Sequence, residues 1–100
     1  MNREAFRYKF NESVSLQDVE ETLLLAVLAI GSLYGESSVR LDASYAMDAD
    51  RQGCVIDGST EVGRAISRVF TGFASREFGD ESFTVRRAHA QPQEPAAAVA

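Results

Sequence analysis

Apolar residues recur at two different spacings along this chain, and the order of the spacings predicts its secondary structure. Alternation of apolar and polar residues is typical of half-buried β-strands. On this basis, strands are predicted at residues 6–10, 38–47, 54–57 and 83–86. The third of these is short and is predicted from the turn residues before and after it. In the first strand the aromatic residues are expected to face the core, because burying the basic residues between them would be costly.

Two longer segments carry apolar residues three and four positions apart, which is the spacing of an amphipathic helix. The first helix is predicted at residues 15–34 and is expected to end at Gly35, while the second begins at Ser59 or Thr60 and ends at Gly79. The predicted buried stripes are Leu16, Val19, Leu23, Ala26, Val27, Ile30 and Tyr34 in the first helix, and Val62, Ile66, Val69, Phe70 and Phe73 in the second. On the second helix, the residues expected to face solvent are Arg64, Ser67, Arg68 and Thr71.

The resulting order is strand, helix, strand, strand, helix, strand. It fits an α+β two-layer sandwich of the ferredoxin-like type, with a four-stranded antiparallel sheet and two helices on one face. Right-handed crossovers give the strand order 4-1-3-2. We expect one domain at residues 1–88 and a disordered tail at residues 89–100, where Ala, Gln, Pro and Glu dominate. The residues expected to share one core are Phe6, Tyr8, Leu41, Tyr45, Val69, Phe73 and Val85.

Composition and charge narrow the classes of function. The chain has 100 residues, of which 45% are hydrophobic, enough for a single core. Its net charge of −5 argues against a general nucleic-acid binder. The most apolar run, residues 23–33, is shorter than the roughly 20 residues that cross a bilayer, and the first residues lack a secretory signal. The lone Cys54 fits a reducing compartment, so we expect a cytoplasmic protein without membrane attachment.

Motifs that would fix a chemistry are weak. The turn at residues 48–53 resembles the opening of a calcium-binding loop, but Ser59 stands where a glutamate ligand belongs. Residues 58–64 follow a strand and open a helix, as a phosphate-binding loop does, but the lysine is missing. The one histidine, His89, lies outside the expected domain. We therefore predict no catalytic residue, no metal and no cofactor, and favour a non-enzymatic protein.

Basic side chains are expected to gather on the exposed face of the sheet. No aromatic residue interleaves with them, as RNA-binding sheets require, and acidic residues on the same face can pair with them. Two interpretations remain, a solvated salt-bridged face or a site for an anion or acidic partner. The candidate anion-binding residues are Arg7, Lys9, Arg40 and Arg86, with Ser59 and Thr60 at the start of the second helix.

The first helix carries more apolar surface than one core needs. Three of its leucines lie roughly 80° to 180° around the helix from Leu16, outside the buried stripe. The strand at residues 38–47 is longer than its hairpin mate and leaves unpaired backbone at the sheet edge. The candidate interface residues are Leu24, Leu25, Leu28, Val39 and Leu41.

These features favour a module for protein interaction or self-assembly that associates through the helix at 15–34 and the edge strand at 38–47. The expected partner is a second copy, with a dimer favoured, or another protein, and not a nucleic acid or a membrane. The alternative is a regulatory domain that binds a small anionic ligand at a protomer interface or on the exposed sheet face.

Overall fold

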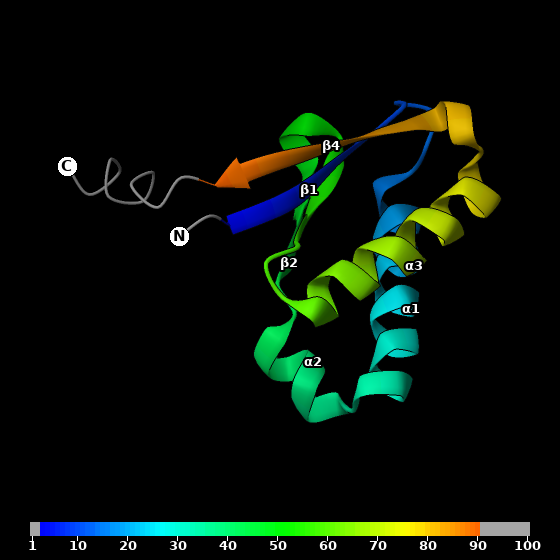
Figure 1. Cartoon of the computed structure of the whole chain (residues 1–100). Coiled ribbons are helices and arrows are strands. Elements are labelled where there is room, and N and C mark those ends of the chain that lie inside the picture. Colours follow the sequence, from blue (N-terminus) through cyan, green and yellow to red (C-terminus); the bar gives the residue numbers. More distant parts are fainter. Residues whose placement is uncertain (1–2, 91–100) are drawn as a thin grey trace.

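A four-stranded antiparallel sheet and three α-helices make up the computed structural model, which describes residues 3–90 (Figure 1). The elements are β1 (Arg3–Phe10), α1 (Leu16–Tyr34), α2 (Glu36–Asp42), β2 (Tyr45–Asp48), β3 (Gly53–Asp57), α3 (Glu61–Phe78) and β4 (Phe83–Ala90), with 3-10 turns η1 (Ala49–Arg51) and η2 (Asp80–Ser82). The α+β class is confirmed. The strand order, β2-β3-β1-β4, agrees with the predicted 4-1-3-2.

β1 is the central strand on which the core is built. It pairs antiparallel with β3 on one side and with β4 on the other. Tyr8 and Phe10 are buried, whereas Arg7 and Lys9, which alternate with them, are exposed. The predicted orientation of this strand is therefore confirmed. The buried apolar residues of the core are Tyr8, Phe10, Val19, Leu23, Ala26, Ile30, Cys54, Ile56, Val62, Ile66, Phe70 and Ala74.

The two long helices, α1 and α3, pack against each other and against this core. In α3 the side chain of Thr60 accepts a hydrogen bond from the Gly63 N–H at 2.9 Å, which identifies Thr60 as the cap. The helix ends before Gly79, whose φ of 90° favours glycine. The predicted limits of both helices are therefore confirmed to within a residue or two, and most of the α1 stripe is buried, with Tyr34 exposed at its end.

The long strand predicted at residues 38–47 is wrong. A short helix, α2, occupies Glu36–Asp42, and β2 covers only Tyr45–Asp48. Val39 and Ala43 are four residues apart, a spacing that places them on one side of a strand and also of a helix, and both are half-buried. Leu41 is 83% exposed because it lies roughly 200° around the helix from Val39. Gly35, at a φ of 93°, separates α1 from α2 and allows the chain to change direction between them.

The buried face of α3 is rotated from the predicted one. Ser67, expected to face water, is 4% exposed, whereas Phe73, expected in the core, is 36% exposed. Ser67 is buried at little cost because its hydroxyl bonds to that of Tyr8. The small Ala74 occupies the buried position one turn after Phe70. Of the seven residues expected to share one core, those that are exposed are Leu41, Tyr45, Phe73 and Val85.

The last strand is longer than expected. β4 continues to Ala90 and pairs with β1 along its whole length, so that His89 belongs to the strand. Residues 91–100 lie outside the described part of the chain, so the disordered tail stays a prediction for them.

Candidate interaction surfaces

A groove of about 650 Å³ lies between α1, α2 and the start of β2. A methyl group added at Gly31 would lie 3.8 Å from Val39 Cγ2, an ordinary contact distance, so the two helices approach each other at this glycine. We call this surface the α1/α2 groove. Its lining residues are Val27, Leu28, Gly31, Ser32, Glu36, Val39, Arg40, Ala43 and Tyr45.

The predicted interface residues divide between this groove and other surfaces. Leu28 lines the groove and is 68% exposed, and Leu24, one turn earlier on the same flank of α1, is 44% exposed. Val39 joins them from α2 and is half-buried. Leu25 and Leu41 are exposed but are not among the residues that line the groove. The structure thus places Leu28 and Val39 in the lining of the groove, with Leu24 one helical turn from Leu28.

A second depression, of about 400 Å³, lies between α3 and the strands β1 and β4. Three arginines and one glutamate give its lining a formal charge of +2, although the whole chain carries −5. We call it the arginine hollow. Its lining residues are Glu4, Phe6, Tyr8, Arg64, Ser67, Arg68, Thr71, Val85 and Arg87.

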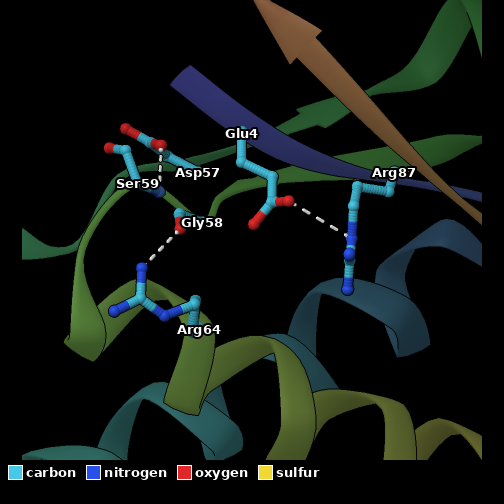
Figure 2. A network of polar contacts seen from close by, with 6 residues as sticks. All are labelled: Glu4, Asp57, Gly58, Ser59, Arg64 and Arg87. Carbon is cyan, nitrogen blue, oxygen red and sulfur yellow. Dashed lines mark hydrogen bonds and ion pairs between the residues drawn. The ribbon is translucent and has the colours of Figure 1, made fainter. Parts of the chain in front are cut away.

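Two of these arginines are held in place by contacts with the chain. Arg87 Nε lies 3.3 Å from Glu4 Oε2, and its guanidinium carbon lies 5.6 Å from the centre of the Phe6 ring. Arg64 Nη1 donates a hydrogen bond of 3.1 Å to the Gly58 carbonyl. Figure 2 shows the Glu4 side chain between the two arginines, with Arg64 on α3 and Arg87 on β4. The loop before α3 is fixed as well, since the Gly58 N–H donates to the Glu4 carbonyl at 2.7 Å.

Three hydroxyl groups form the inner wall of the arginine hollow. The Tyr8 hydroxyl bonds to the Ser67 hydroxyl and, at 2.8 Å, to that of Thr71. Thr71 in turn donates to the Ser67 carbonyl at 2.8 Å. Burial raises the pKa of Tyr8, and its two hydroxyl partners oppose this effect only in part. These groups tie β1 to α3 and are satisfied by one another.

Arg64 and Arg68 are exposed, as expected, but the sequence does not indicate that they lie beside β1 and β4, so it does not predict the arginine hollow. The available signal was strand parity, since Arg87 is two residues from Val85 and therefore lies on the same face of β4. The register confirms this placement, because Arg87 pairs with Phe6 and Val85 pairs with Tyr8.

The opposite face of the sheet carries three of the predicted anion-binding residues. Arg7 and Arg86 are register partners in neighbouring strands, and both line a depression of about 140 Å³ together with Lys9. Arg51 lines it too and lies 3.7 Å from Asp48. Arg40 is not on the sheet, because it belongs to α2 and lines the α1/α2 groove.

The two remaining candidates lie at the start of α3 and have partners within the chain. The Ser59 N–H donates to Asp57 Oδ1 at 2.9 Å (Figure 2). Thr60 caps the helix and donates its own hydroxyl to the Asp42 carbonyl at 2.8 Å. The bond from Thr60 to Asp42 joins the start of α3 to the end of α2 and leaves Thr60 without a free hydroxyl proton for an anion.

Cys54 belongs to β3, and its thiol is buried in the core. Burial raises its pKa from 9.0 to about 12, which makes it a poor nucleophile at neutral pH. Within residues 3–90 no three His, Cys, Asp or Glu side chains are grouped closely enough to hold a metal ion. None of the helices in this part of the chain has the length and apolar character needed to span a membrane.

Comparisons with known proteins do not extend this picture. No family model matches the chain, and neither the curated proteins nor the solved structures contain a significant match to it.

Proposed function

We propose that this protein is a self-association module whose two copies meet through the α1/α2 groove. The observation that carries the proposal is the combination of an apolar groove with exposed leucines on its flank, Leu24 and Leu28. A surface that offers both a recess and protruding apolar side chains can pair with a copy of itself around a two-fold axis. The proposal keeps the interface predicted on the first helix and replaces the edge strand by α2.

The charges at the groove favour a second copy over an unrelated partner. Glu36 and Arg40 both line it and come from the same short helix. In a two-fold interface, a contact from one residue of the first copy to another residue of the second copy occurs twice, because the symmetry repeats it with the two copies exchanged. Glu36 of one copy can therefore pair with Arg40 of its partner twice, which would set the orientation of the two chains.

The apolar contribution is large enough to matter. Full burial of a leucine is worth about 1.5–3 kcal/mol, and Leu24 and Leu28 are 44% and 68% exposed. Covering both therefore contributes about 2–3 kcal/mol in each copy, or about 4–6 kcal/mol in a symmetric pair, before the costs of association.

The test is the double variant Leu24→Gln, Leu28→Gln, with Leu33→Gln as its control. Leu33 is 78% exposed and does not line the groove, so it loses similar apolar surface elsewhere on α1. Sedimentation and light scattering at micromolar to millimolar concentration should show association of the wild type. The double variant should dissociate at least about a hundredfold more readily, while the control behaves as wild type. A wild type that remains monomeric throughout this range refutes the proposal.

Two further hypotheses concern the fold type and the alternative function. We propose the ferredoxin-like type of two-layer sandwich, with α1 and α3 on one face of the sheet, which the strand order β2-β3-β1-β4 supports. The alternative function, binding of a small anion on the open sheet face, has the Arg7 and Arg86 pair in its favour. Its depression is small, however, at about 140 Å³.

A further inference from the structure

We propose that the arginine hollow binds a small organic anion, in which a carboxylate or phosphate head is joined to an apolar body. This site lies on the side of the sheet that bears Tyr8 and is distinct from both the α1/α2 groove and the open sheet face. The proposal therefore stands or falls independently of self-association.

Charge is the first reason. The lining carries a formal charge of +2 in a chain of −5, so the hollow attracts anions locally although the chain as a whole is acidic. Arg64 and Arg68 are one helical turn apart on α3, and Arg87 approaches from β4. A guanidinium group binds carboxylate and phosphate oxygens through paired N–H donors. An anionic head in the hollow can thus be held from two sides.

The positions of the arginines are the second reason. Arg64 uses Nη1 for the Gly58 carbonyl, and Arg87 uses Nε for Glu4 while its guanidinium group packs on Phe6. Each guanidinium has five N–H donors, so most of them remain for a ligand. Because these side chains are already held by the chain, binding restricts them less than it would restrict freely rotating arginines.

Glu4 acts as an internal competitor in this geometry. Its carboxylate lines the hollow between Arg64 and Arg87, where the head of a ligand would lie (Figure 2). Arg87 Nε lies within ion-pair distance of it, at 3.3 Å. A ligand head therefore has to share or replace this contact. Removing the charge of Glu4 should strengthen binding, an effect that a purely structural role of Glu4 does not predict.

The remaining walls select an apolar body. Phe6 and Val85 supply apolar surface, and Val85 is 39% exposed although it lies on the face of β4 that points toward the core. The hydroxyl groups of Tyr8, Ser67 and Thr71 already bond to one another and demand no polar partner. A volume of about 400 Å³ is in the range of pockets for small organic ligands.

The experiment is a titration of the full chain, labelled with nitrogen-15, with benzoate, phenyl phosphate, inorganic phosphate and benzyl alcohol. Benzoate or phenyl phosphate should shift the amide signals of Ser67, Thr71 and Val85 in a saturable way, and comparison of the two identifies the preferred head. Inorganic phosphate and benzyl alcohol, which lack the body or the charge, should each bind at least about fivefold more weakly.

Matched variants locate the site. Arg87→Gln should weaken benzoate binding about tenfold, whereas Arg86→Gln, the same change one residue away on the opposite face, should leave it unchanged. Glu4→Gln should strengthen binding about threefold or more. Arg68→Gln, an exposed side chain of α3, serves as a second loss variant if Arg87→Gln alters the circular dichroism spectrum.

Several results would overturn the proposal. One is the absence of saturable shifts with benzoate and with phenyl phosphate up to about 50 mM, far above the range of a useful site. Equal losses in Arg86→Gln and Arg87→Gln would reduce the effect to general charge attraction. Binding of benzyl alcohol as tight as that of benzoate would remove the anion from the proposal, and preferential binding of inorganic phosphate would remove the apolar body.

Discussion

Replacing Gly31 with alanine adds one methyl group to the floor of the α1/α2 groove. The new carbon would meet only Val39 Cγ2, at 3.8 Å, so the monomer accepts it without strain. Alanine is better than glycine in a helix by about 0.5–1 kcal/mol, and contact of the methyl with Val39 adds a few tenths of a kcal/mol up to about 0.8. We therefore expect Gly31→Ala to raise the free energy of unfolding by about 1–1.5 kcal/mol.

Gly72→Ala is the matched control for this change. Gly72 lies in the interior of α3, and a methyl group there would meet nothing within 4 Å. It should gain only the helix term, about 0.5–1 kcal/mol. Urea denaturation followed by circular dichroism at micromolar concentration measures both changes on the same scale.

The two variants should differ in association. The methyl group at Gly31 takes up space that the partner's leucine would fill in the proposed pair, and overpacking of this kind costs about 1–3 kcal/mol. Gly31→Ala should therefore dissociate about tenfold more readily than wild type, and Gly72→Ala should not. A lower urea midpoint for Gly31→Ala alone would show that the α1–α2 contact is tighter than the structure has it. A stabilised variant with unchanged association would exclude the groove as the interface.

Two other predictions concern the core. Phe70 is fully buried, with the centre of its ring 4.9 Å from that of Tyr8, whereas Phe73 is 36% exposed. Phe70→Ala should therefore lower the free energy of unfolding by about 3–5 kcal/mol, and Phe73→Ala by only about 1–2 kcal/mol. The reverse order in urea denaturation would contradict the observed face of α3. The raised pKa of Cys54 makes the stability of the fold depend on pH. Between pH 9 and 12 the thiol loses its proton in the unfolded chain but keeps it in the folded chain. The free energy of unfolding therefore falls as pH rises, by at most about 1.4 kcal/mol per pH unit. Urea midpoints from pH 8 to 9, below the range where Tyr8 adds appreciably to the effect, should fall with pH in the wild type and change less in Cys54→Ala. Equal slopes would mean that the thiol already ionises in the folded chain.

The parts of the fold that the sequence predicts correctly are those in which one periodicity dominates. The three aromatic residues of β1 alternate with cations, and α1 carries apolar residues at helical spacing over 19 residues, so neither allows a second interpretation. Residues 36–48 allow two interpretations, because the spacing of Val39 and Ala43 places them on one side of a strand and also on one side of a helix. The short α2 was missed for that reason.

The rotation of α3 and the arginine hollow depend on contacts between distant parts of the chain. Ser67 can be buried only because Tyr8, 59 residues away, offers it a hydroxyl partner. The hydrophobicity of neighbouring residues does not predict that bond, and the sequence pattern therefore places Phe73 in the core and Ser67 in solvent. The same rotation turns Arg64 and Arg68 toward β4. Of the hollow's lining, the sequence pattern places Phe6, Tyr8 and Val85 on the core side of their strands, and the parity of β4 adds Arg87 to that side.

β4 gives the sheet an edge of eight residues, since it pairs only with β1 in the described part of the chain. An edge this long is a template on which unfolded or foreign strands can grow into aggregates. Arg86 and Arg87 are adjacent and exposed, so they place a cation on each face of the edge. A strand that docks here has to bring its own backbone close to both charges. Guanidinium groups stay protonated at every pH at which proteins fold, so this barrier to aggregation does not vary with pH, whereas added salt weakens it by screening.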